Sequence, residues 1–135
     1  MRRPSGERGA SAVEFAILLP LMLLIIGGIV DFGRFFFAKI ELTNAAREGA
    51  RAAVVTTGTP TPGPTERALA ALPGVTTPSV AISPICATAG STATVTVSVS
   101  SPFEWMVLEP AMKLVGGAAA LPPSVGGKAA MRCGG

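Results

Sequence analysis

The sequence has no histidine and no tyrosine, and charged residues make up only 14% of its 135 positions. Without histidine, a nucleophilic serine lacks its usual base. The lysines Lys39, Lys113 and Lys128 lie in stretches that we expect to be solvated or in loops. Two cysteines without any histidine make a zinc centre implausible. We therefore expect a protein that is not an enzyme and that holds no metal and no cofactor.

A strong charge of either sign is also missing. The formal net charge is +3, and the basic residues are scattered along the chain, which argues against a nucleic-acid-binding protein. The mean hydropathy is +0.54, a value that suits a membrane-tethered chain better than a free soluble one.

One long apolar stretch dominates the chain, from Ala10 to Val30, with the sequence ASAVEFAILLPLMLLIIGGIV. Its uncharged part, from Phe15 to Val30, spans roughly 24 Å as a helix at about 1.5 Å per residue. A bilayer core is about 30 Å thick, so the stretch crosses it comfortably only when counted from Ala10. Glu14 then lies in or at the edge of the apolar layer, where a carboxylate costs about 2.5–3.5 kcal/mol on insertion scales.

The flanks of this stretch predict its orientation. Residues 1–9 carry Arg2, Arg3 and Arg8 against Glu7 alone, and a short basic flank stays in the cytoplasm. After the apolar run, the sequence IVDFGRFFF offers no small residues for signal cleavage, so we expect the run to be retained. The sequence therefore predicts a single-pass protein of the cell membrane with an extracytoplasmic carboxy-terminal portion.

The helical pattern continues beyond Asp31 to about Thr56 and ends at the proline-rich segment 57–65. Along this part, a stripe of mostly small apolar residues recurs at helical spacing: Leu42, Ala45, Ala46, Gly49 and Ala53. Such a stripe allows a sheet or a second helix to approach closely. It could pack inside the same chain, against another subunit, or both.

The remaining residues favour a small sheet. In Thr92–Ser100 four apolar residues alternate with Thr or Ser, which indicates a half-buried strand. Ser79–Ala87 predicts a second strand, which Pro84 restricts to a sheet edge or a bulge. Short candidate strands follow at Ala118–Leu121 and Lys128–Cys133, and Thr65 is expected to cap a short helix. The predicted fold is α+β, with a long membrane-spanning helix extending into a small antiparallel β-sheet head.

We accordingly divide the chain into three parts: a cytoplasmic leader at 1–9, a transmembrane and extended amphipathic helix at 10–57, and an extracytoplasmic head at 58–135 with a short helix and about three strands. If the head is exported, a disulfide between Cys86 and Cys133 is the favoured interpretation, and it would join the last strand to the first. Two unrelated buried thiols are the alternative.

Residues 101–115, with the sequence SPFEWMVLEPAMKLV, are harder to interpret. We expect their larger apolar side chains to pack on the sheet: Phe103, Met106, Val107, Met112 and Leu114. The alternative is a loop that touches the membrane, since Trp105 has an apolar body and a polar tip.

Three runs of the sequence together resemble the TadE-like pseudopilins of the tight-adherence (Tad/Flp) pilus system. These are RGASAVEF at residues 8–15, the apolar run through AILLPLMLLIIGGIVDFGR, and LTNAAREGAR before Ala52. The resemblance is close from about Arg8 to Ala53. It implies a protein similar to type IVb pilins, whose leader is removed by a membrane-embedded aspartic prepilin peptidase. The cut would fall between Gly9 and Ala10. It would remove three arginines and one glutamate and so lower the formal charge from +3 to +1.

The resemblance also implies a role in assembly for Glu14 and the adjacent Phe15. In a pilin-like bundle, the Glu14 carboxylate of one subunit could meet the new Ala10 ammonium of its neighbour, and the pairing would offset the cost of burying the charge. The alternative is a Glu14 side chain that reaches up to the lipid headgroups.

The implied function is that of a minor pilin or pseudopilin of a Tad-type pilus, acting in pilus biogenesis, assembly or adhesion. The implied partners are other pilin or pseudopilin subunits, the prepilin peptidase and the Tad secretion machinery. A β-containing head distinguishes the chain from the much shorter major pilins. The competing interpretations are an unprocessed single-pass protein with an extracytoplasmic binding module, and a secreted soluble domain released by cleavage after the apolar run.

Overall fold

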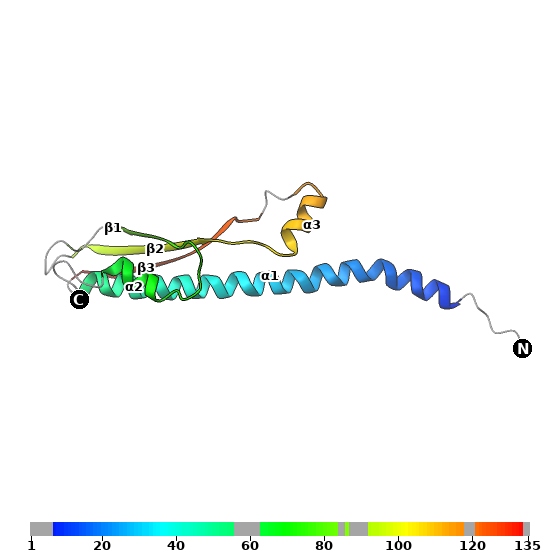
Figure 1. Ribbon diagram of the computed structural model, residues 1–135, viewed down its shortest axis with the longest axis horizontal. Helices are drawn as coiled ribbons and strands as arrows, with labels where there is room; N and C mark the ends of the chain where they lie inside the picture. The colour runs from blue at the N-terminus through cyan, green and yellow to red at the C-terminus, as the bar shows by residue number, and fades with distance from the viewer. Residues whose placement is uncertain (1–6, 56–62, 84–85, 87–91, 118–120, 134–135) are drawn as a thin grey trace, which may run out of the picture. The chain divides into compact units, whose positions relative to one another are not determined.

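The computed structural model describes residues 7–55, 63–83, 86, 92–117 and 121–133 (Figure 1). Their contacts divide the chain into two compact units. The first unit holds the described residues up to Gly33 and those between Trp105 and Leu121, and the second holds the described residues between Arg34 and Glu104 and those from Pro122 onward. Helix α1 (Glu7–Val55) runs without interruption through the residues of both units.

Helix α1 continues through Pro20 and ends at Val55, ahead of the proline-rich segment that was predicted to stop it. Residues 56–62 lie outside the described residues. At the other end, the helix is already formed at Glu7, inside the segment expected as the leader.

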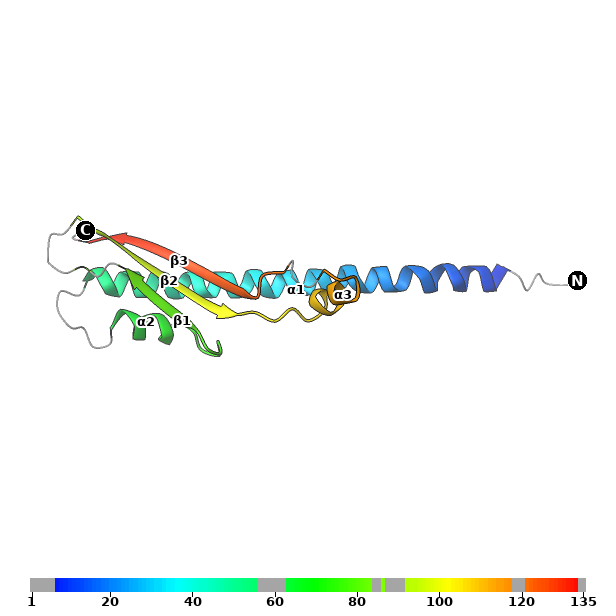
Figure 2. The same cartoon turned by 90° about the horizontal axis from the view of Figure 1, so that it is seen from above.

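In the second unit, three antiparallel strands pack against the carboxy-terminal part of α1 in the order β1-β2-β3 (Figure 2). They are β1 (Ser79–Ser83), β2 (Thr94–Pro102) and β3 (Ser124–Arg132). The alternation in β2 has the predicted effect, because Val95, Val97 and Val99 are all buried in the core. The result confirms the α+β, pilin-like class predicted from the sequence.

The strand bounds differ in part from those predicted. β1 is an edge strand that ends at Ser83, directly before Pro84, which itself lies outside the described residues. β3 begins at Ser124 rather than at the predicted Lys128. The added residues include the Gly126-Gly127 pair, and glycines of this kind usually weaken a strand. A Cβ at Gly127 would lie 2.6 Å from the carbonyl carbon of Leu42, so the missing side chain lets β3 rest on the backbone of α1. Of the candidate strand at 118–121, residues 118–120 lie outside the described residues.

The short helix α2 (Pro64–Ala70) also belongs to the second unit. Its N-cap is Gly63 rather than the predicted Thr65, because Pro64 has a backbone angle suited to the first helical position. Glu66 accepts a hydrogen bond from the Gly63 N–H at 2.9 Å and so caps the helix.

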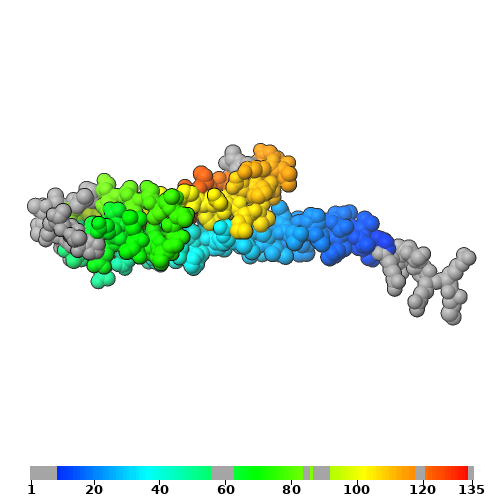
Figure 3. Space-filling view, in the orientation of Figure 1, coloured from blue at the N-terminus to red at the C-terminus, as the bar shows by residue number. Residues whose placement is uncertain are grey.

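In the first unit, residues 108–114 form a helix, α3 (Leu108–Leu114), that the sequence did not predict. Figure 3 shows it in gold against the light-blue part of α1. The expectation that the larger apolar side chains of residues 101–115 pack on the sheet is wrong for Met106 and Leu114, which are exposed. Val107 packs on Gly27 of α1 instead. Phe103 does join the core of the second unit, with its ring centroid 5.3 Å from that of Phe35.

Candidate functional site

The amino-terminal end of α1 is open to its surroundings. Gly9 is exposed, and a Cβ at this position would meet no atom within 4 Å. Ala10 and Glu14 are also exposed, and their spacing of four residues puts them on the same side of the helix, with Phe15 next to them. The residues implied as the cleavage and assembly site therefore lie together at the start of the helix, within reach of another protein.

The apolar run that follows is exposed around most of its circumference. The exposed fraction reaches 71% at Ile17, and large apolar side chains are exposed from Val13 to Val30. A helix that is apolar all round belongs inside a large core or in a membrane. By length and composition, α1 is able to cross a membrane.

The small-residue stripe lies in the second unit and is covered by the chain itself. Ala45, Ala46, Gly49 and Ala53 are buried. A Cβ at Gly49 would lie 3.0 Å from the Cβ of Ala68 in α2 and 3.3 Å from Val97 in β2. The structure therefore fills this face from within the same chain, as the first interpretation of the stripe predicted.

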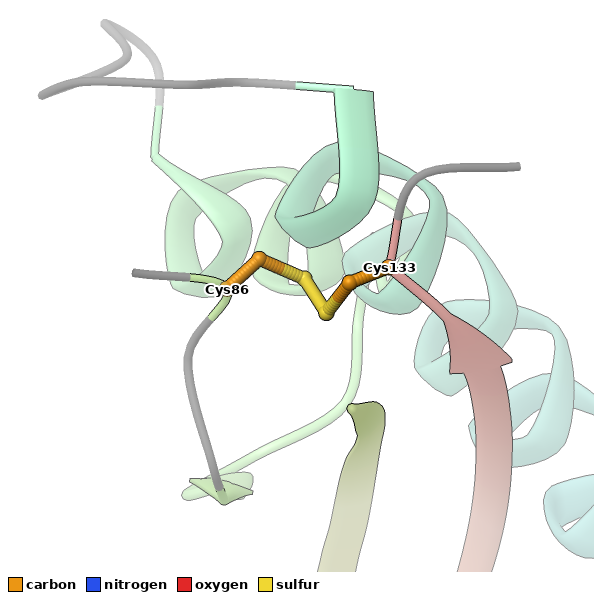
Figure 4. Close-up of a disulfide and its surroundings, with 2 residues drawn as sticks. All are labelled: Cys86 and Cys133. Atoms are coloured by element: carbon orange, nitrogen blue, oxygen red, sulfur yellow. A yellow bond between two sulfur atoms is a disulfide. The ribbon is translucent and has the colours of Figure 1, made fainter. Parts of the chain in front are cut away.

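Cys86 and Cys133 form a disulfide, the favoured interpretation of the two cysteines (Figure 4). Both follow an edge strand, Cys86 after β1 and Cys133 after β3, and these two strands point the same way because each is antiparallel to β2. Their carboxyl ends therefore meet at one end of the sheet, with the two Cα atoms 5.9 Å apart. The Cys133 N–H also donates to the Ala93 carbonyl at 2.8 Å, which extends the β2–β3 ladder.

Asp31 in the first unit is fully buried, although it is charged and ends the apolar run. Its Oδ1 accepts a hydrogen bond from the N–H of Met106 at 3.0 Å, and its Oδ2 accepts from Val107 at 2.8 Å and Leu108 at 2.9 Å. Three successive amides thus satisfy one carboxylate. This clasp, as we call Asp31 with these three amides, fixes the start of α3 on α1.

A shallow cavity of about 260 Å³ lies in the second unit. It is lined by residues of α1, of the segment 74–76 before β1 and of the ends of β2 and β3, among them Arg34, Phe37, Ser101 and Val125. Its polar groups bond within the chain: Ser101 donates to the Thr76 carbonyl at 3.1 Å, and Arg34 donates to the Glu104 carbonyl at 3.3 Å. Within the described ranges, no group of three or more His, Cys, Asp or Glu side chains could hold a metal ion.

Comparison with known families finds a match for the amino-terminal part of the chain. Residues 9–51 match the family model described as TadE-like protein. Through this segment, the chain is similar to TadE-like proteins. This similarity implies a protein associated with the Tad pilus. No curated protein and no solved structure matches the chain.

The TadE-like segment includes Gly9, Ala10, Glu14 and Phe15 and most of the small-residue stripe. It stops short of Ala53 and of both cysteines, so the sheet and its disulfide lie outside the matched residues. The segment also contains Asp31.

Sequence reasoning missed the role of Asp31, which it treated as the outer end of the apolar run. Two signals were present: an acidic residue at the end of a span, and the Gly27-Gly28 pair one turn before it. A Cβ at Gly27 would lie 2.5 Å from Val107 Cγ1, so the glycine leaves room for the segment that Asp31 binds. The sequence could not indicate which segment that was, since Met106 is 75 positions away.

Proposed function

We propose that this TadE-like protein is a minor pilin or pseudopilin, anchored in the cell membrane by the apolar part of α1 and acting in the biogenesis or assembly of a Tad pilus. The observation that carries the proposal is the exposure of Glu14 beside Ala10, at the start of an apolar helix segment inside the TadE-like match. Its partners are the prepilin peptidase, other pilin-like subunits and the Tad secretion machinery.

In this proposal, the peptidase cuts between Gly9 and Ala10. The exposure of Gly9 supports it, because a protease needs access to both sides of the bond that it cuts. The reaction leaves an ammonium at Ala10, and Glu14 of a neighbouring subunit pairs with it when the helices bundle. The pairing favours assembly over the isolated subunit, since a lone carboxylate in lipid is costly.

Intact-mass measurement of the protein from isolated membranes tests the cleavage. We expect an amino terminus at Ala10 in the wild type and an uncut chain after Gly9→Leu. The matched control is Gly33→Leu, which places the same side chain at another exposed glycine of α1, where a Cβ meets nothing within 4 Å. It should be cut normally. A wild-type protein that begins at residue 1 or 2 would instead support the unprocessed single-pass alternative.

Pilus assembly in cells tests the role of Glu14. We expect Glu14→Ala to leave the protein in the membrane at normal levels and to reduce piliation at least tenfold. Glu48→Ala removes a second exposed carboxylate of α1, outside the apolar run, and should have no effect. Normal piliation with Glu14→Ala would show that the carboxylate is not needed and merely reaches the headgroups.

A further inference from the structure

We propose that residues 105–115, which we call the foot, rest in the interfacial layer at the outer surface of the lipid bilayer. The inference depends on the membrane anchoring proposed above. It concerns the first unit alone, and it assigns a lipid-contacting surface to a segment outside the TadE-like match.

The first step is how the foot is held. The clasp binds Met106, Val107 and Leu108 through their backbone N–H groups, and Asp31 has no exposed surface. Beside it, the rings of Phe32 and Trp105 pack edge to face with centroids 5.6 Å apart. The foot is therefore fastened to α1 at residues 27–32, which is where the apolar run ends at Val30.

The second step is what the foot exposes. Met106 is 64% exposed, Leu114 89% and Val115 79%, so three large apolar side chains point away from the protein. The nearby charges of α3 neutralise each other, because Lys113 and Glu109 form an ion pair at 2.7 Å. A surface of this kind gains from burial in an apolar layer and does not resist it by net charge.

The third step is depth, which selects lipid as the occupant. The foot covers the glycine side of α1, at Gly27 and Gly28, while Ile26, Ile29 and Val30 of the same turns stay exposed. When those side chains contact lipid, the foot that borders them lies at the same level, at the boundary of the hydrocarbon. Trp105 itself is buried against Phe32, so the exposed aliphatic side chains make the contact and the tryptophan does not.

The single tryptophan allows a direct test. In a Trp105→Phe background, the full chain carries one new tryptophan and is reconstituted in phosphatidylcholine vesicles with bromines either near the headgroup or deep in the acyl chains. We expect Leu114→Trp to be quenched at least twofold more by the shallow bromines than by the deep ones. Met106→Trp provides a second, independent reading of the same surface and should behave alike.

Two control positions separate this inference from the anchoring. Leu18→Trp, in the middle of the apolar run, should be quenched most by the deep bromines, and Val55→Trp, at the polar end of α1, should be unquenched. Quenching at residue 18 with none at residues 106 and 114 would contradict the lipid contact of the foot and would still support the membrane anchoring by α1. No quenching at residue 18 would overturn both. If the fluorescence of Leu114→Trp is blue-shifted but not quenched, the lipid contact of the foot would also be contradicted, because the side chain would then be buried against protein.

The clasp is tested in the same assay. Adding Asp31→Ala to Leu114→Trp should reduce the shallow quenching at least twofold, because the foot is released from α1. Gly28→Ala is the matched control, since its Cβ would meet Leu108 at an ordinary 3.7 Å, and the quenching should persist. Unchanged quenching with Asp31→Ala would show that the carboxylate does not hold the foot in place.

Discussion

The two halves of α1 differ in the burial of their apolar side chains. From Val13 to Val30 the large aliphatic residues face outward and stay exposed. From Leu42 to Ala53 the apolar residues are mostly alanine or glycine and lie under the sheet, where Leu42 is only 1% exposed. One continuous helix thus contains a segment that its own chain packs and a segment that its own chain leaves uncovered.

The difference shows what each half requires from outside. The second half has its core already, because the sheet and α2 fill the space above the small side chains. The first half exposes a contiguous apolar surface of the kind that soluble monomers avoid. Its stability in water would be poor, and a lipid layer or a bundle of similar helices would remove that cost. Substitutions in the packed half should therefore change mainly the stability of the fold, and substitutions in the uncovered half should change mainly the association with the membrane.

The largest effect should come from the disulfide, which belongs to the packed region alone. Replacing Cys86 and Cys133 by Ser frees a loop of 47 residues, and the chain-entropy estimate for such a loop is about 4 kcal/mol. We expect a marked drop in the thermal midpoint of the purified full chain in detergent, followed by circular dichroism. Recovery of the protein in membranes should stay normal. Loss of membrane recovery would show that the apolar half depends on the sheet.

Next in size is a charge in the uncovered half. Leu18→Arg exchanges a favourable residue for an unfavourable one near the middle of the apolar run, at about 3.5 kcal/mol on insertion scales. We expect a large decrease in the fraction of protein that resists carbonate extraction from membranes. Ile40→Arg is the matched control, because Ile40 is 60% exposed, close to the 55% of Leu18, but lies beyond the run. Equal extraction of both variants would contradict the comparison.

When a side chain is shortened rather than charged, the larger effect is expected in the packed half of α1. Leu42→Ala removes a fully buried side chain and should lower the free energy of unfolding by about 3 kcal/mol. Leu18→Ala makes the same change at an exposed position and should alter it by less than about 0.5 kcal/mol. Thermal unfolding of the two variants in detergent is the measurement. If Leu18→Ala were the more damaging, the apolar half would have a packed core after all.

A smaller effect should test the close approach of β3 to α1. Gly127→Ala drives a Cβ into the backbone of Leu42 and Thr43, and overpacking of this kind costs about 2 kcal/mol. Gly126→Ala points to the exposed side of the same strand, where the nearest atom is a carbonyl oxygen at 3.2 Å, and should cost less. Similar thermal midpoints for the two variants would mean that β3 can shift away from α1 without loss.

Local pattern was enough for several elements because their causes are local. The alternation in Thr92–Ser100 placed β2, and the prolines of 57–65 placed the end of α1 near Val55. The stripe of Ala45, Ala46 and Gly49 marked the side of α1 that needs a close neighbour. α3 was not predicted. The early start of β3 was not predicted either, because Gly126 and Gly127 are poor strand formers, and only the close contact of Gly127 with α1 makes a glycine suitable there.

The proposed amino-terminal site rests on the order of Gly9, Ala10 and Glu14 along the chain and on the apolar run behind them, and its role stays a prediction. The contacts of Asp31 were not predicted, because a carboxylate at the end of a span has the same local signature whether it faces water or binds a distant backbone.

Residue order and periodicity therefore suffice for a helix long and apolar enough to cross a membrane, for the end of that helix and for the central strand, and the cysteine pair was the favoured interpretation. Which segment lies over Gly27 and Asp31, and which strand rests on Leu42, are matters that only the folded chain settles. The physical reason is sequence distance: amides some 75 positions from Asp31 meet its carboxylate only after the chain has folded back on α1, and no local preference encodes that meeting.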